Sequence, residues 1–219
     1  MITILQHGPG EAPGNILPHL TVRAVPFRIL NLWENDPVPT ESCEPVIILG
    51  GLMSVNDEKE YPFLKEEKAL VRTLAARNVP VLGICLGAQM IANAFGKPVT
   101  KAEIPELGWY AAQRAGPGLP GHPATYAVYE WHNETFALPE GAELLATGNP
   151  VRNQAFRLGS CIGVQYHMEA TPEIIRNWAK DLPAESRQKM EEDTGKYMDG
   201  SFSRCGILLD YFLSLGGRV

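Results

Sequence analysis

One cysteine stands between two glycines, in an arrangement that suits a nucleophile. Residues 83–87 have the sequence Gly-Ile-Cys-Leu-Gly, after a run of apolar residues and before a helical pattern. A sharp turn from strand to helix of this kind lifts a nucleophilic side chain clear of a sheet. It also puts Cys85 at the amino end of a helix, where a thiolate is stabilised. Many cysteines are only small core hydrophobes, but the flanking glycines favour a nucleophile here.

A histidine and a glutamate two residues apart form the second candidate group. His167 and Glu169 stand at the end of the predicted strand 161–167. A cysteine nucleophile needs a base, and the base needs a partner that orients it. Side chains at i and i+2 of a strand project to the same side, so the sequence predicts a Cys85–His167–Glu169 triad. A lone histidine at a strand end is more often structural, and it is the cysteine turn that favours catalysis.

Backbone amides near the cysteine are candidates for an oxyanion hole. Attack on a carbonyl produces an oxyanion, which needs hydrogen-bond donors already in position. The Leu86 amide follows the nucleophile directly. The Gly51 or Leu52 amide, just after the apolar run 46–49, could be the second donor. Two glycines after a strand are by themselves an ordinary turn, so this prediction depends on the neighbouring cysteine.

The elements that position these residues alternate between strand and helix. Apolar runs predict strands at 2–6, 28–32, 46–49 and 79–84, and helical spacing predicts helices at 16–20, 62–77 and 86–95. Strands that are apolar throughout are buried on both faces, as in a parallel sheet. Ligands bind such sheets at the carboxyl ends of the strands. The first half of the chain therefore predicts a parallel, doubly wound α/β core.

The pattern changes after residue 97. Short strands with turns between them are expected at 109–113, 125–129, 143–147, 154–157 and 161–167. Thr171 and Pro172 predict the cap and first residue of a helix. A solvated helix at 184–198 and an apolar-faced helix at 203–215 follow. No linker or repeat divides the sequence, so we expect a single domain over residues 1–219.

Charge and composition exclude several classes of function. The 219 residues carry a net charge of −6, which argues against binding to nucleic acid or an anionic membrane. No signal peptide or apolar run long enough to span a bilayer is evident. The four cysteines lack CxxC spacing, so neither a zinc site nor a disulfide framework is expected. A reducing, cytoplasmic location fits these features.

Taken together, the motifs resemble those of class I (triad) glutamine amidotransferases. Residues 83–89 (Gly-Ile-Cys-Leu-Gly-Ala-Gln), Gly50-Gly51 and residues 163–169 (Gly-Val-Gln-Tyr-His-Met-Glu) carry the resemblance. Within that family the chain is most similar to the free-standing GMP-synthetase-like group. Residues 5–7 (Leu-Gln-His), 106–110 (Glu-Leu-Gly-Trp-Tyr) and Trp131-His132 resemble that group. The similarity covers about residues 1–170.

The resemblance implies a flavodoxin-like, mostly parallel sheet flanked by helices, with a small antiparallel addition. It implies release of ammonia from glutamine through a γ-glutamyl thioester on Cys85, with no cofactor and no metal. His167 would shuttle the proton, Glu169 would orient His167, and Gln89 and the Gly51 region would hold the substrate. His132 corresponds to a residue that contacts the amino-acid end of the substrate.

Two positions depart from the family pattern. Met168 replaces the usual proline between the triad members, and its side chain should point away from the site. Asn133-Glu134 replaces the common Gly-Asp. Glu134 keeps a carboxylate that could pair with the substrate ammonium group, on a longer side chain.

Three functions are compatible with these motifs. The sequence shows no P-loop or synthetase domain, so a glutaminase of this type would pass ammonia to a separate synthetase subunit or another acceptor. The alternative is a γ-glutamyl peptidase that acts on glutathione-like compounds with the same residues. A third possibility is a non-catalytic binding protein that retains the fold. The intact set of Cys85, His167 and Glu169 argues against that third function.

Overall fold

The computed structural model describes residues 1–215, and their strands form one sheet. The sheet has nine strands in the order β2-β1-β3-β4-β9-β8-β7-β5-β6. The first five in this order are parallel: β2 (Phe27–Asn31), β1 (Ile2–Gln6), β3 (Val46–Ile48), β4 (Val81–Ile84) and β9 (Cys161–Val164). A parallel core at these positions confirms the alternation of strand and helix that the sequence predicts.

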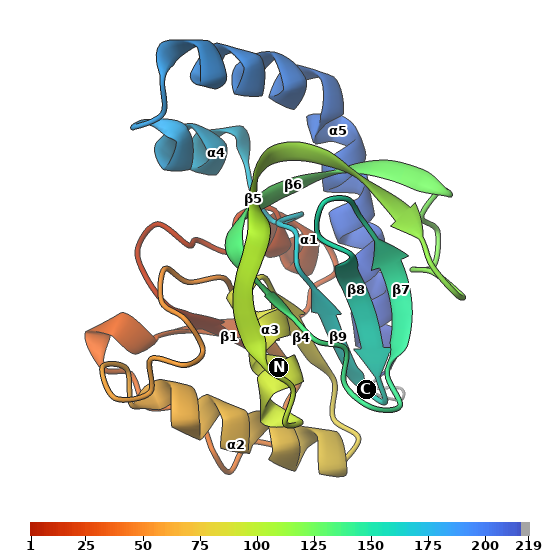
Figure 1. Cartoon of the computed structure of the whole chain (residues 1–219). Helices are drawn as coiled ribbons and strands as arrows, with labels where there is room; N and C mark the ends of the chain where they lie inside the picture. The colour runs from red at the N-terminus through yellow and green to blue at the C-terminus, as the bar shows by residue number, and fades with distance from the viewer. Residues whose placement is uncertain (216–219) are drawn as a thin grey trace.

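Helices cover both faces of the parallel half of the sheet (Figure 1). They are α1 (Ile16–Val22), α2 (Phe63–Ala76), α3 (Leu86–Ala94) and α5 (Ala184–Ser214), and a short 3₁₀ turn spans Leu32–Glu34. Ile47 packs in the cluster that includes residues of α1 and α5. Its neighbour Ile48 packs in the cluster that includes residues of α2 and α3. Successive residues of β3 thus face opposite layers, as in any strand buried on both sides.

The other half of the sheet is antiparallel and larger than predicted. It consists of β8 (Asn153–Leu158), β7 (Glu143–Thr147), β5 (Val99–Arg114) and β6 (Thr125–Phe136). The sheet is therefore mixed, and the prediction of a mostly parallel sheet with a small antiparallel addition is only partly confirmed. The reason lies in β5, whose residues 100–105 are mostly exposed and give no apolar alternation. The pairing register also shifts between Lys101 and Glu106.

β5 and β6 form a long, curved hairpin that reaches from α5 to α3 (Figure 1). Beyond the sheet, α4 (Pro172–Ala179) begins as predicted, because the Thr171 side chain accepts a hydrogen bond from the Ile174 amide. α5 is one continuous helix of 31 residues, although the sequence predicts two. Within residues 1–215, no helix combines the length and the apolar character needed to cross a membrane.

The first half of α5 is less solvated than its composition suggests. Met190 and Thr194 are buried, and the Thr194 hydroxyl accepts a hydrogen bond of 3.0 Å from the Trp109 indole. These contacts join the polar half of the helix to the β5–β6 hairpin. Ser201, between the two predicted helices, is also buried within the continuous helix.

Candidate active site

Cys85 occupies a strained turn between β4 and α3. Its φ is 51° and its ψ is −105°, a conformation that non-glycine residues rarely adopt and that is typical of functional sites. A Cβ atom added at Gly83 would lie 2.3 Å from the backbone of Gly87. One added at Gly87 would lie 2.2 Å from the Ile48 carbonyl oxygen. The two glycines therefore let the helix start pack directly against the strand that precedes Cys85 and the strand beside it.

His167 and Glu169 make the predicted contact, although not for the predicted reason. β9 ends at Val164, so neither residue lies on a strand. The chain bends after β9 and the His167 amide donates a hydrogen bond of 2.7 Å to the Tyr129 carbonyl of β6. The His167 Nδ1 atom then lies 2.7 Å from Glu169 Oε1, with both side chains buried. The pair is fixed by the crossing hairpin and not by strand alternation.

The other ring nitrogen of His167, on the opposite edge of the imidazole, faces the nucleophile. Nε2 of His167 is buried and has no ordinary hydrogen-bond partner within residues 1–215. Burial alone would lower the pKa of His167, but its charge interactions with Glu169 and Cys85 outweigh burial and raise the pKa well above the ordinary value. The indole of Trp178 meets the imidazole edge-on, with ring centroids 4.7 Å apart. Such an environment favours the imidazolium form of His167.

The residues after β3 lie close to this pair. A Cβ atom added at Gly50 would be 3.0 Å from Cε1 of His167 and 3.8 Å from Cβ of Cys85. Gly51, Leu52 and Leu86 line the same pocket as Cys85. The three residues predicted to supply oxyanion donors therefore line one pocket with the nucleophile, and Leu86 is the first residue of α3.

A buried ion pair that sequence analysis does not detect supports the end of β3. The Nδ1 atom of His7 donates a hydrogen bond of 2.9 Å to the Gly50 carbonyl. Its Nε2 atom lies 3.1 Å from Glu67 Oε1, and both side chains are fully buried. Burial by itself would lower the pKa of His7, but the charge of Glu67 raises it overall. The contact joins residues 60 positions apart, which no local motif reveals.

The predicted substrate-binding residues meet at one carbonyl group. The Glu134 carbonyl accepts hydrogen bonds from Gln89 Nε2 at 3.1 Å and from His132 Nδ1 at 2.9 Å. Gln89 Nε2 also donates to Gln165 Oε1 at 3.3 Å. The Glu134 carboxylate accepts a hydrogen bond of 3.1 Å from the Ser54 hydroxyl. All three predicted residues line the pocket.

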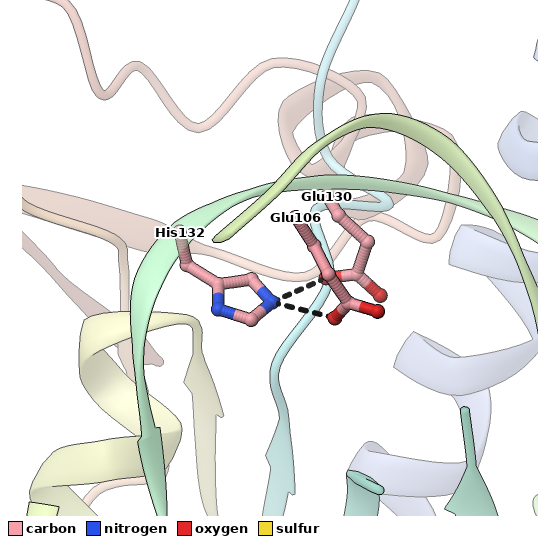
Figure 2. Close-up of side chains that lie close together, drawn as sticks. All are labelled: Glu106, Glu130 and His132. Atoms are coloured by element: carbon pink, nitrogen blue, oxygen red, sulfur yellow. Dashed lines mark hydrogen bonds and ion pairs between the residues drawn. The ribbon is translucent and has the colours of Figure 1, made fainter. Parts of the chain in front are cut away.

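His132 differs from the prediction in the direction of its ring. Its Nε2 atom faces inward and lies 3.0 Å from Glu106 and 3.1 Å from Glu130 (Figure 2). Burial would lower the pKa of His132, but the bonds with these carboxylates raise it to about 10. Burial raises the pKa of Glu130 to about 7. Because the protein engages both ring nitrogens, a direct polar contact between His132 and a substrate is not available in this conformation.

The pocket around Cys85 has a volume of about 560 Å³ and is also lined by residues to which the sequence assigns no role. Trp131, Trp178 and Glu11 line it. Burial raises the pKa of Glu11, which lies near His167 and His7. Trp131 belongs to a segment that carries the family resemblance, but only the fold shows that these three residues lie in the pocket.

The chain is similar to known proteins in sequence and in fold. A family model described as glutamine amidotransferase class-I matches residues 15–177. The chain belongs to the class I glutamine amidotransferase family. Its relatives include GMP synthase subunits and free-standing glutamine amidotransferase-like proteins.

Three of these class I glutamine amidotransferases illustrate the similarity. The chain is 35% identical over 191 residues to a subunit of the glutamine-hydrolysing GMP synthase of Pyrococcus furiosus, covering 82% of this chain and 97% of that protein. It is 29% identical over 202 residues to the amidotransferase-like protein YfeJ of Salmonella typhimurium, covering 87% and 82%. A glutamine amidotransferase structure from Methylobacillus flagellatus superposes with a TM-score of 0.92 at 28% identity, covering 100% of this chain and 96% of that one. The match spans 27% of the longer GMP synthases.

Proposed function

We propose that this class I glutamine amidotransferase hydrolyses the side-chain amide of glutamine to glutamate and ammonia. The observation that carries the proposal is the convergence of the strained Cys85 turn and the His167–Glu169 pair on one pocket. A nucleophile and a base in one pocket, with a buried carboxylate bonded to the base, suit acyl transfer. Family membership supports the choice of glutamine as substrate.

In the first half-reaction the Cys85 thiolate attacks the amide carbon, and the carbonyl oxygen becomes an oxyanion. The amides of Leu86 and of Gly51 or Leu52 stabilise this charge. The intermediate collapses as His167 donates its Nε2 proton to the amide nitrogen, which leaves as ammonia. A γ-glutamyl thioester remains on the cysteine.

In the second half-reaction water attacks the thioester carbon and gives its proton to His167. The carbon–sulfur bond breaks, glutamate is released and the sulfur leaves as thiolate. Glu169 holds the imidazole in one orientation throughout both steps. Glu134 pairs with the ammonium group of the substrate, Gln89 contacts its amino-acid end, and His132 holds the Glu134 carbonyl in position.

Ammonia from this reaction passes to a separate acceptor. The relative from Pyrococcus furiosus is named as a subunit, which supports a synthetase on a second chain. We therefore expect glutaminase activity to rise when the cognate acceptor protein is present.

A covalent label tests the proposal. The purified protein, treated with a glutamine-like diazoketone, should gain the mass of one adduct at Cys85 and lose activity. Cys85→Ala should lower kcat by about 10⁴-fold or more. Cys43→Ala, at an exposed thiol, is the matched control and should retain activity. A Cys85→Ala variant as active as the wild type would exclude the mechanism.

The size of the pocket favours one second candidate, a γ-glutamyl peptidase. A volume of about 560 Å³ is within the range of about 300–1,000 Å³ that holds drug-sized ligands, and exceeds what one amino acid needs. The aromatic rings of Trp131 and Trp178 would contact a bulkier leaving group. Parallel assays with glutamine and γ-glutamyl dipeptides separate the candidates, because a higher kcat/KM on the dipeptides would replace the first proposal with the second.

A further inference from the structure

Three buried side chains of the β5–β6 hairpin point toward one another (Figure 2). Glu130 and His132 are two residues apart on β6, and Glu106 on β5 pairs in register with His132. All three therefore project from the same face of the hairpin. Each offers one donor atom, and these donor atoms lie within 4.8 Å of one another. We call these residues the carboxylate–histidine cluster.

The hydrogen bonds of the protein leave this cluster incomplete. The His132 Nε2 atom lies 3.0 Å from a Glu106 oxygen and 3.1 Å from a Glu130 oxygen. A single N–H group cannot form two well-aligned hydrogen bonds, one to each of these carboxylate oxygens. The fully buried Glu130 side chain forms the 3.1 Å ion pair with His132, but neither of its oxygens makes a well-formed hydrogen bond within residues 1–215. A buried carboxylate with so few hydrogen bonds is costly.

The surroundings of the cluster are those of a metal-binding site. Metal-binding histidines generally donate their other ring N–H to a carbonyl or carboxylate. The Nδ1 atom of His132 donates to the Glu134 carbonyl at 2.9 Å, so Nε2 is the ring nitrogen that a metal ion would bind as it displaces the proton there. Metal-binding carboxylates are in turn hydrogen-bonded. Glu106 accepts bonds from Gln154 Nε2 at 2.8 Å and from the Val151 amide at 3.3 Å.

We propose that Glu106, Glu130 and His132 bind one divalent transition-metal ion of the zinc type. Imidazole nitrogen and carboxylate oxygen are both ligands of zinc, and water would occupy a fourth position. The charge of the ion balances the two carboxylates. Donors bound to one tetrahedral zinc ion are about 3.3 Å apart. The separations of 3.0 and 3.1 Å from His132 need to widen by only a few tenths of an ångström.

The ion reaches the cluster from the active-site pocket, because His132 forms part of the pocket wall. The role of the ion is structural, because it fixes the His132 ring, which donates a hydrogen bond to the Glu134 carbonyl. That carbonyl also accepts the Gln89 hydrogen bond. The expectation of no zinc site rests on the cysteine spacing, which does not address a site made of carboxylates and histidine.

Metal titration of the full chain tests this proposal. The experiments use a Cys85→Ala background, so that the catalytic cysteine and His167 cannot together bind the ion. After treatment with a chelator, calorimetry should show one zinc ion per chain, and cobalt should give a visible absorption band. Added zinc should raise the Tm by mass action. Glu130→Gln should abolish all three signals while preserving the far-ultraviolet circular dichroism spectrum.

Two further variants distinguish this site from adventitious binding. Gln154→Leu removes a hydrogen bond to Glu106 and should weaken zinc binding by about 10- to 100-fold. Glu11→Gln removes a pocket carboxylate outside the cluster and should leave affinity unchanged. The proposal is overturned if Glu130→Gln binds zinc as tightly as its parent. It is also overturned if the parent binds no zinc at micromolar concentration.

Discussion

At His167, burial and charge act on the imidazole in opposite directions. Burial disfavours the imidazolium form, but the charges of Glu169 and Cys85 favour it and raise the pKa overall. In the proposed mechanism His167 must be protonated to expel ammonia. Activity should therefore persist at alkaline pH and fall only as the pH rises through the raised pKa of His167.

Glu169→Gln should shift this alkaline limit toward lower pH, because it removes one of the charges that raise the pKa of His167. It should also lower kcat by about 10²–10⁴-fold, the usual contribution of general acid–base catalysis. The measurement is kcat/KM for glutamine from about pH 6 to about pH 10. The exposed Glu173→Gln is the control. An alkaline limit unchanged in Glu169→Gln would contradict the assigned role of this carboxylate.

The four cysteines should differ sharply in reactivity. Burial raises the pKa of Cys161 to about 12 and also raises the pKa of Cys205, so neither forms thiolate at neutral pH. Cys43 is exposed, and Cys85 lines the pocket. Alkylation of the native protein, followed by peptide mass spectrometry, should modify Cys85 and Cys43 alone. In denaturant all four should react, and rapid native labelling of Cys161 would contradict the protection that its burial should give.

At the scale of elements, the oxyanion region depends on how the end of β3 is held. The His7–Glu67 pair connects β1 and α2 to the Gly50 carbonyl. His7→Ala would leave a buried carboxylate unpaired, and we expect a loss of about 3–5 kcal/mol in unfolding free energy. It should also lower kcat, because the Gly50–Gly51 backbone loses its anchor. Glu67→Gln can still hydrogen-bond to His7, so it should lose less unfolding free energy and less kcat than His7→Ala.

The contribution of His7 should also depend on pH. Its pKa is raised in the folded protein, so its stabilising effect is complete below the unfolded value of 6.5 and declines as pH rises through the folded value. Urea titrations should thus show a larger difference between wild type and His7→Ala near pH 6 than near pH 9. Equal differences at both pH values would mean that the pair is not ionic.

The elements that the sequence predicts best are those buried on both faces. β1, β3 and β4 are continuous apolar runs, and Cys85 follows the last of them directly. Most of β5 escapes prediction because its exposed first half has no apolar alternation. The strand predicted to carry His167 ends three residues early, because the residue's amide bonds to Tyr129 of a distant hairpin. Local pattern identifies the candidate catalytic residues, and long-range contacts decide their geometry.

Partners that come from distant segments are beyond sequence analysis. The inward direction of His132 depends on Glu106 from the neighbouring strand, which belongs to the family resemblance but has no predicted role. Glu11 and Trp178 reach the pocket from a loop and from α4. Their types and spacing resemble those of ordinary surface residues. Only the folded chain reveals that they lie near the nucleophile.

At the scale of the whole molecule, α5 joins the two halves of the protein. Its first half buries Met190 in the cluster formed with α4 and the β5–β6 hairpin. Its second half buries Cys205, Leu208 and Phe212 in the core cluster that includes residues from both halves of the sheet. The helix therefore supports the hairpin over the active site as well as the sheet beneath it.

Phe212→Ala should test this role of α5. Phe212 is fully buried in the main cluster, so its truncation should cost about 3–5 kcal/mol of unfolding free energy. Phe202 lies on the same helix with 45% of its surface exposed, and Phe202→Ala should change stability by less than about 0.5 kcal/mol. Urea unfolding followed by circular dichroism gives both values. Because Phe212 does not line the pocket, the folded variant should still accept the diazoketone label at Cys85. A loss of labelling in the folded state would mean that α5 also controls the geometry of the active site.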